Sequence, residues 1–269
     1  MVIFTDLDGT LLDHKSYSWE AASPALNLIK QRAIPLVLCS SKTWTEIEAL
    51  RHQLDNHDPF IPENGGGIFI PNGYFDFSFA FQKKVSHYQV IELGTPYSRL
   101  REALLLITQQ TGIHLKGYGD LSAGEISAQT GLSIQDAHLS KQREYDEPFI
   151  FMGTDEQRKR ILRLIEEMGL NWTKGSRFDH LTGANDKGKA VRILRELFKH
   201  KFGKNTTVAL GDSPNDLPML AAVDYPILIQ RPGGGYEESI QLPGLIRAGG
   251  IGPEGWRNAI LKLLASLAD

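Results

Sequence analysis

The 269-residue chain contains 41% hydrophobic and 23% charged residues, an ordinary globular composition at a length that favours two domains, or one domain with a large insertion. Its formal net charge of −3 provides no basic field for nucleic acid or an anionic membrane surface. The single cysteine, Cys39, excludes an internal disulfide and a cysteine-based metal cage. We find no signal-peptide pattern and no apolar run near the roughly 18 residues that cross a bilayer, so we expect a cytoplasmic protein without membrane partners.

The first third of the chain alternates short buried-strand patterns with amphipathic helical patterns. Ser23-Pro24 is a helix-start signal, and Thr43 with Glu46 fits a capping box at the start of the next helix. Because strands alternate with helices, we expect a parallel sheet covered on both sides. The predicted strands of this part are residues 2–5, 34–39, 60–61 and 68–70.

Residues 83–183 have a different pattern, with two amphipathic helices flanked by strand-like pieces such as 89–93, 148–152 and 171–180. The last third returns to the first pattern, with a helix over residues 186–200 and strands over 206–210 and 225–229. Trp256 and the apolar residues after it mark a closing helix. We therefore predict one α/β domain formed by residues 1–82 and 184–269, into which a smaller α/β domain, residues 83–183, is inserted.

Polar clusters follow three of the predicted strands. In an open parallel sheet, ligands bind beyond the carboxyl ends of the strands, so these clusters are expected to meet at one edge. Carboxylates that converge there would repel each other strongly, and a hard divalent cation such as Mg²⁺ relieves this repulsion. The clusters are Asp6 with Asp8, then Ser40, Ser41 and Lys42, and finally Asp212, Asn215 and Asp216.

The spacing of these residues predicts roles in phosphoryl transfer. Asp6 and Asp8 lie two positions apart on an extended segment, so both side chains can face the site. We expect Asp6 to be the nucleophile, because carboxylates can form aspartyl-phosphate intermediates, and Asp8 to be the general acid and base. Ser40 is expected to donate its hydroxyl to the phosphate, although it could also merely cap a helix. Lys187, near a helix start, is expected to neutralise phosphate and nucleophile.

These motifs, in this order along the chain, resemble those of the haloacid dehalogenase superfamily. The resemblance rests on Asp6-Leu7-Asp8-Gly9-Thr10, Ser40, Lys187-Gly188 and Gly211-Asp212-Ser213-Pro214-Asn215-Asp216. It implies a Rossmann-like parallel-sheet core with an inserted α/β cap domain of the size found in the Cof-type branch. It also implies Mg²⁺ held by Asp6, the backbone carbonyl of Asp8, and Asp212, with Asn215 and Asp216 in support.

A narrower resemblance is to mannosyl-3-phosphoglycerate phosphatases. The segments that carry it are residues 38–43, 63–66, 143–149 and 175–180. It implies that the substrate is a small phosphorylated sugar-glycerate, with Arg143 and Arg177 offering planar forks to the glycerate carboxylate and Glu147, Asp179 and His180 binding sugar hydroxyls. The predicted substrate-binding residues are thus Ser41, Lys42, Asn64, Gly65, Arg143, Glu147, Arg177, Asp179 and His180.

Other interpretations stay open at this point. A broad Cof-type sugar-phosphate phosphatase shares all of the core motifs, and a phosphomutase would also use Asp8. A non-catalytic sugar-phosphate binding module would explain a cap over a polar sheet edge, but it predicts the loss of at least one of the core motif residues, and all are present. The sequence leaves open whether the sugar is mannose or glucose, and whether the protein is a monomer or a homodimer. We also expect the cap to close over substrate through linkers near residues 81–83 and 183–186.

Overall fold

The computed structural model describes residues 1–175 and 178–266, and its centre is a five-stranded sheet with the strand order β12-β11-β10-β1-β2. Every neighbouring pair in this sheet is parallel. The sheet consists of β1 (Val2–Thr5), β2 (Leu36–Leu38), β10 (Thr207–Gly211), β11 (Tyr225–Gln230) and β12 (Ile246–Ile251). The two ends of the chain therefore form one sheet, and the predicted α/β class with a parallel-sheet core is confirmed.

Alternating side chains of the strands form two apolar layers, one on each face of the sheet. Ile3 and Leu210 belong to the layer under α1 and α9, whereas Phe4 and Ala209 belong to the layer under α7 and α8. This two-sided burial is the usual arrangement of a parallel sheet. The helices around the sheet are α1 (Ser23–Gln31), α2 (Trp44–Leu54), α7 (Lys187–Phe202), α8 (Leu217–Leu220) and α9 (Gly252–Ser266), with single 3₁₀ turns at Glu20–Ala22, Glu63–Gly65 and Pro214–Asp216.

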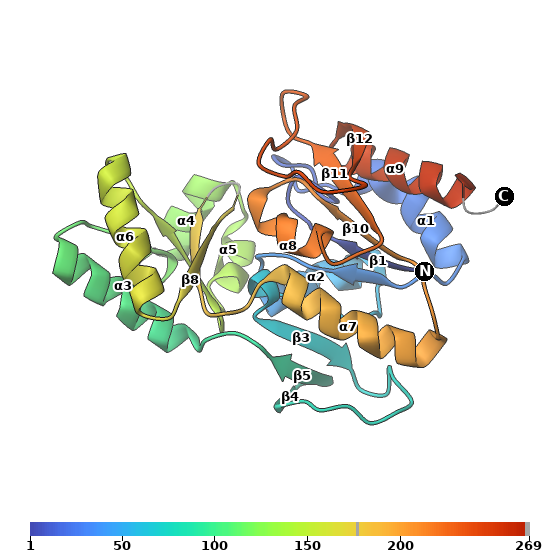
Figure 1. The fold of residues 1–269 in the computed structure, drawn as a ribbon, viewed down its shortest axis with the longest axis horizontal. Helices are drawn as coiled ribbons and strands as arrows, with labels where there is room; N and C mark the ends of the chain where they lie inside the picture. The colour runs from blue at the N-terminus through green and yellow to red at the C-terminus, as the bar shows by residue number, and fades with distance from the viewer. Residues whose placement is uncertain (176–177, 267–269) are drawn as a thin grey trace.

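A small antiparallel sheet, β3-β5-β4, extends the central domain (Figure 1). It contains β3 (Gly67–Pro71), β4 (Lys83–Val85) and β5 (Tyr88–Glu92). Tyr88 and Val90 of β5 are buried in the same apolar layer as Ile3. The domain boundary that the sequence places at residue 83 remains a prediction. Residues 83–92 contain β4 and β5, which form one sheet with β3.

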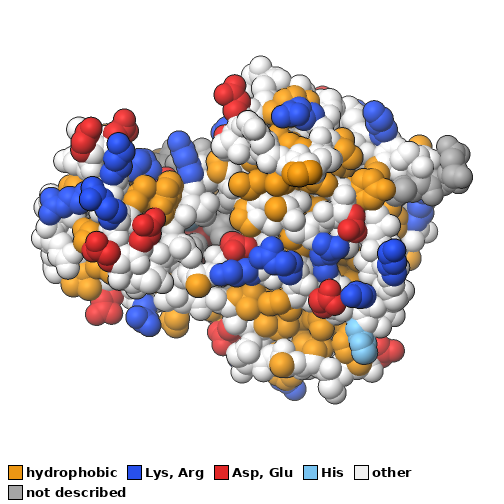
Figure 2. All heavy atoms as spheres, in the orientation of Figure 1, with side chains coloured by type: hydrophobic (Ala, Val, Ile, Leu, Met, Phe, Trp, Pro, Cys, Tyr) orange, Lys and Arg blue, Asp and Glu red, His pale blue; other side chains and the backbone are white. Residues whose placement is uncertain are grey.

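The second lobe is built on a four-stranded antiparallel sheet with the order β6-β7-β9-β8, and it stands beside the central domain in Figures 1 and 2. Apolar residues of α3 and α6 pack on one face of this sheet. The expected single strand over residues 171–180 is instead two antiparallel strands joined near Gly175. The elements are α3 (Tyr97–Thr111), β6 (Lys116–Gly117), a 3₁₀ turn at Tyr118–Asp120, α4 (Ala123–Thr130), α5 (Ile134–Ser140), β7 (Asp146–Ile150), α6 (Asp155–Glu167), β8 (Asn171–Lys174) and β9 (Asp179–Thr182).

Among the helices of the described residues, none combines the length and the apolar character needed to cross a membrane.

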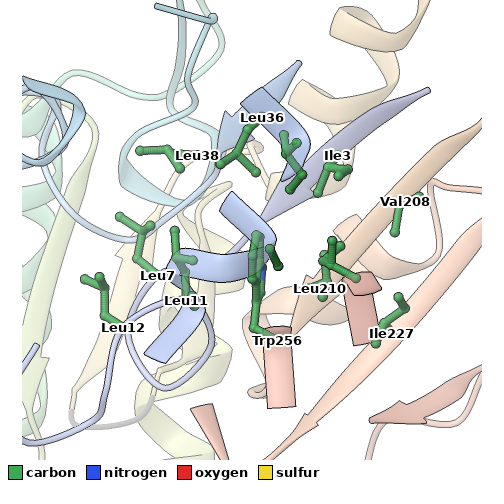
Figure 3. Close-up of a cluster of buried hydrophobic side chains, with 14 of the residues drawn as sticks. Ile3, Leu7, Leu11, Leu12, Leu36, Leu38, Val208, Leu210, Ile227 and Trp256 are labelled. Carbon is green, nitrogen blue, oxygen red and sulfur yellow. The ribbon is translucent and has the colours of Figure 1, made fainter. Parts of the chain in front are cut away.

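Trp256 on α9 connects the apolar core to the end of β1. Its ring is fully buried among leucines and isoleucines of the sheet (Figure 3). The indole Nε1 donates a hydrogen bond to Thr5 Oγ1 at 3.0 Å, and this hydroxyl donates to the backbone carbonyl of Asp6 at 2.8 Å. The apolar core therefore supports the backbone at Asp6, the residue that directly follows β1.

Replacing Trp256 by Phe removes this hydrogen bond and leaves a space in the core. We expect the free energy of unfolding to fall by about 2–3 kcal/mol, measured by urea denaturation followed by circular dichroism. Lys262→Ala, an exposed position on the same helix, is the matched control and should change stability by less than about 0.5 kcal/mol. Equal stability of Trp256→Phe and wild type would contradict this account.

Candidate active site

Lys187 is the central cation of the polar sheet edge. Its side chain is fully buried, and its Nζ lies 2.6 Å from Asp6 Oδ1 and 2.7 Å from Asp216 Oδ1. Asp186 caps α7 by accepting a hydrogen bond from the Lys189 N–H at 2.7 Å, so the helix begins at Lys187 and this side chain stands in the first turn. The start of α7 thereby joins the ends of β1 and β10.

Asp216 organises the loop that follows β10. Its Oδ2 accepts hydrogen bonds from the backbone N–H groups of Asp212 and Ser213, both at 3.0 Å, while its Oδ1 receives Lys187. Both of its oxygens thus bind protein donors. The Asp212 carboxylate is held differently, since Thr10 Oγ1 donates to its Oδ1 at 3.0 Å.

Gly9 permits the close approach of the first motif to Asp212. Its φ is +85°, and a Cβ atom at this position would lie 2.9 Å from Asp212 Oδ2. A side chain would therefore require both a strained backbone and a shift of the carboxylate. Glycine at this position lets the turn after Asp8 pass beside Asp212.

The negative charge at this edge exceeds the positive charge. Carboxylate oxygens of Asp6, Asp212 and Asp216 lie within 4.8 Å of one another. Burial and the neighbouring carboxylates raise the pKa of Asp6 and of Asp212, and Lys187 opposes this effect. Asp8 has its own partner, Lys42, at 3.0 Å. The three buried carboxylates of Asp6, Asp212 and Asp216 thus face one buried ammonium group, that of Lys187.

The two charges left over equal the charge of one divalent cation, and carboxylate oxygens are the ligands that hard cations prefer. Asp8 Oδ1 is also buried with no hydrogen-bond partner among the described residues. The residues present therefore fit a divalent cation, and the buried cluster of Asp6, Asp212 and Asp216 could bind one.

The second polar cluster follows β2. Ser40 is buried, and its Oγ accepts a hydrogen bond from the Lys42 N–H at 3.3 Å. Ser41 and Lys42 line the same cavity as Asp6 and Asp8. The Lys42 ammonium contacts Asp8 and Glu46 and lies 4.9 Å from the ring centroid of Tyr17, and all three partners belong to the central domain.

The cavity between the two lobes has a volume of about 70 Å³. Asp6 and Asp8 line it from the central domain, and Tyr118, Phe178 and His180 line it from the second lobe. It therefore combines carboxylates, a lysine and aromatic rings, a mixture suited to an anionic group attached to a hydroxyl-rich body.

Arg143 also lines the cavity, but its guanidinium is already engaged. Its Nε donates to the Ser140 carbonyl and its Nη1 donates to the Ser41 carbonyl, both at 3.0 Å. The guanidinium also lies 5.0 Å from the ring centroid of Tyr118. Arg143 thus ties the second lobe to the loop after β2, and its predicted contact with a carboxylate ligand stays a prediction.

Asn64 and Gly65 lie behind the cavity rather than on its wall. Asn64 has a φ of +54°, its Nδ2 donates to Asp146 Oδ2 at 2.6 Å, and its Oδ1 accepts from Asn215 Nδ2 at 3.0 Å. Asn215 itself lines the cavity. Asn64 therefore connects the second lobe to the loop after β10.

Glu147 and Asp179 do not reach the cavity in this structure. The Glu147 carboxylate forms an ion pair with Arg101 at 2.6 Å, and the Asp179 carboxylate forms one with Arg158 at 2.8 Å. Both residues lie on the face of the second sheet that packs on α3 and α6, because side chains alternate along a strand. Pro148 and His180 are on the opposite face and line the cavity. Arg177, the remaining predicted ligand, lies outside the described residues.

Asp146 was not among the residues predicted from the sequence, although it is fully buried beside His180. His180 Nδ1 lies 2.9 Å from Asp146 Oδ1. Strand alternation contains the signal that was missed: if Pro148 faces the cavity, then Asp146 faces it as well and Glu147 does not. Tyr17 and Tyr118, two further cavity residues, carry no comparable signal because they lie in irregular segments.

The chain belongs to the haloacid dehalogenase-like hydrolase family, whose model matches residues 3–231. It is 50% identical over 263 residues to a glucosyl-3-phosphoglycerate/mannosyl-3-phosphoglycerate phosphatase of Methanococcoides burtonii, covering 98% of this chain and 97% of the relative. It is 37% identical over 228 residues to a mannosyl-3-phosphoglycerate phosphatase of Pyrococcus horikoshii, covering 85% and 90%. These matches confirm the predicted family and the predicted enzyme class, a phosphoric monoester hydrolase.

Solved structures agree with the fold. The structure of Thermoplasma acidophilum 0175 superposes with a TM-score of 0.70 at 16% identity, covering 98% of this chain and 97% of that chain. The sucrose-phosphatase from Synechocystis sp. PCC6803 superposes with a TM-score of 0.64 at 15% identity, covering 100% and 98%. At these identities the similarity is one of fold alone.

Glu63 is a buried acid next to the site that the sequence analysis also left out. Its carboxylate accepts hydrogen bonds from the backbone N–H groups of Glu144 at 3.0 Å and Tyr145 at 2.7 Å. Burial is the main cause that raises the pKa of Glu63 to about 8, and Arg143 opposes it. Glu63 thus attaches the segment before β7 to the central domain.

This raised pKa makes stability depend on pH in a defined direction. The native state binds the Glu63 proton more tightly than the unfolded state, so its contribution to stability is complete below pH 4.5 and is lost as the pH rises through about 8. We expect wild type to be more stable than Glu63→Gln at pH 5, and this difference in unfolding free energy to fall steadily up to pH 8. Urea titrations at several pH values measure it. A difference that stays constant, or rises, would show that Glu63 is ionised in the native protein throughout.

Proposed function

We propose that this chain hydrolyses the phosphate ester of a glycosyl-3-phosphoglycerate and releases a glycosylglycerate. The observation that carries the chemistry is the position of Asp6 beside Asp8 at the end of β1, with the buried Lys187 ammonium 2.6 Å from the Asp6 carboxylate. The proposed substrate comes from the relatives, because two phosphatases named for glucosyl-3-phosphoglycerate and mannosyl-3-phosphoglycerate are 50% and 42% identical over 98% of the chain.

In the proposed reaction, an oxygen of Asp6 attacks phosphorus and the bond from phosphorus to the ester oxygen breaks. Asp8 gives a proton to the leaving oxygen, which departs as the glycerate hydroxyl. Asp8 then takes a proton from water as this water attacks the aspartyl-phosphate, which restores Asp6 and releases inorganic phosphate. Lys187 holds the attacking carboxylate in place and offsets its charge as phosphate approaches.

We further propose that the cation is Mg²⁺, held by the carboxylates of Asp6 and Asp212 and by the backbone carbonyl of Asp8. Asn215 and Asp216 support these ligands, since Asp216 fixes the backbone of Asp212. When bound, Mg²⁺ neutralises charge on the phosphate oxygens. Ser40 and the Ser41 N–H are proposed to position the phosphate at the end of β2.

The cavity requires the second lobe to move during turnover. Its volume of about 70 Å³ is well below the roughly 300 Å³ of a small-molecule pocket, so a glycosyl-3-phosphoglycerate cannot enter this closed arrangement. We propose that the second lobe, the cap, opens on two linkers and closes over the substrate. The second linker is residues 183–186, as expected, and the first is placed at residues 93–96 instead of near 81–83 because β4 and β5 share a sheet with β3. Lys42 is then proposed to meet the glycerate carboxylate, because it lines the cavity.

The substrate assignment is tested by phosphate release from glucosyl-3-phosphoglycerate, mannosyl-3-phosphoglycerate and a panel of simple sugar phosphates. We expect the two glycosyl-phosphoglycerates to give kcat/KM values at least about 100-fold above the panel, since the cap must fit both sugar and glycerate. Asp6→Asn should abolish release, while Asp76→Asn, an exposed position, should retain it. Comparable turnover of many sugar phosphates would instead indicate a broad sugar-phosphate phosphatase.

Cation binding is tested without reference to activity. Because Mg²⁺ would relieve repulsion in the folded state only, we expect it to raise the melting temperature of wild type by several degrees at saturating concentration. Asp212→Asn should remove most of this increase, and Asp76→Asn should not. The same increase in Asp212→Asn as in wild type would place the cation elsewhere.

A further inference from the structure

Asp146 is a fully buried acid of the cap to which the proposed chemistry assigns no role. Its side chain has no exposed area, and it lies on the same face of β7 as the cavity-lining Pro148. Three neighbours surround its carboxylate: the His180 ring, the Asn64 amide, and Arg143 at 3.8 Å. Burial of a carboxylate carries a large desolvation cost, so this site is built around a specific set of hydrogen bonds.

The contact with Asp146 fixes which nitrogen of His180 carries a proton. Both Asp146 oxygens lie near His180 Nδ1, at 2.9 and 3.0 Å. A carboxylate can only accept, so Nδ1 must be the donor. His180 lines the cavity together with Gly175, and a Cβ atom at Gly175 would lie 2.6 Å from His180 Nε2. The absence of a side chain at Gly175 thus lets the backbone pack directly against Nε2 without displacing the His180 ring.

A chain of amides continues from Asp146 into the central domain. Asn64 Nδ2 donates to Asp146, Asn215 Nδ2 donates to Asn64 Oδ1 at 3.0 Å, and Ser213 Oγ donates to Asn215 Oδ1 at 2.7 Å. Turning the Asn64 amide around would direct its oxygen at the Asp146 carboxylate and its NH₂ group at the NH₂ group of Asn215. The polarity of this chain is therefore set by Asp146, because a carboxylate can only accept, whereas the Ser213 hydroxyl can donate or accept.

We propose that Asp146 is a positioning residue that presents His180 Nε2, as a hydrogen-bond acceptor, to a hydroxyl of the sugar. This inference rests on the proposed function, because it names the group that meets the glycosyl part of the substrate. Asp146 binds the His180 ring at Nδ1, and Asn64 of the central domain binds Asp146. The orientation of His180 therefore depends on the cap lying against the central domain. Binding of the sugar hydroxyl is thereby linked to cap closure.

Asp146→Asn provides the test, because asparagine keeps the shape of the side chain. Its amide can present either the oxygen or the NH₂ group to His180, so the acceptor-only partner that keeps Nδ1 protonated is lost. We expect imidazole ¹⁵N spectra, at a pH near 8, to show His180 Nδ1 protonated in wild type and a mixture of the Nδ1-protonated and Nε2-protonated rings in Asp146→Asn. An unchanged protonation state of Nδ1 would overturn the proposal, whether or not any substrate is turned over.

Kinetics on the glycosyl-3-phosphoglycerates then separate positioning from a purely structural effect. We expect Asp146→Asn to raise KM about tenfold with a smaller change in kcat. In a His180→Ala background the same change should have no further effect on kcat/KM. An equal loss in that background would show that Asp146 does not act through His180 and would overturn the proposal. Asp155→Asn, an exposed cap position, is the matched control.

Failure of the proposed function would give a different pattern. If wild type left the glycosyl-phosphoglycerates intact but hydrolysed other sugar phosphates, the substrate would be wrong, and the same mutant cycle would be run on the best of those esters. The ¹⁵N spectra would be unaffected by that outcome. A changed tautomer with no change in KM for any hydroxyl-bearing substrate would show that His180 does not bind the sugar.

Discussion

The buried ammonium of Lys187 is the interaction on which the rest of the site depends. It joins Asp6 of the first segment to Asp216 of the last segment, and both distances are below 2.8 Å. A charge with no exposed area is tolerated only when it is paired, so the start of α7 cannot move away from the two strand ends. The capping of α7 by Asp186 places Lys187, the loop after β10 places Asp216, and Gly9 lets the first segment pass beside Asp212.

The cap is attached to this centre by polar contacts rather than by a continuous apolar core. The apolar residues of the cap form their own clusters, while Arg143, Glu63 and Asn64 make hydrogen bonds across the boundary. Such contacts can be exchanged for water when the lobes separate, at much smaller cost than exposing a core. The lobes are therefore held together less strongly than each lobe is held internally, which suits the proposed opening of the cap during turnover.

The sequence predicted the central domain well because its functional residues lie at the ends of buried strands. A strand of apolar residues followed by Asp6 and Asp8 defines both the element and the side that the acids face. The prediction was poorer where one residue of register decides the outcome. Asp146 was not predicted, and Glu147 was predicted to bind a hydroxyl although it lies on the face toward α3 and α6, because the strand was expected to begin at residue 148 and β7 begins at Asp146. β12 was also missed, since its Gly249-Gly250 pair interrupts any strand pattern.

The most direct test of the central claim asks whether phosphate is ever bound to Asp6. A rapid-quench experiment on wild type with labelled substrate, stopped within the first turnover, should leave label on the protein. Reduction with borohydride followed by mass spectrometry should place the modification at Asp6. The account predicts that label appears at this residue before free phosphate is released. Label on another residue, or release of phosphate without any labelled protein, would contradict it.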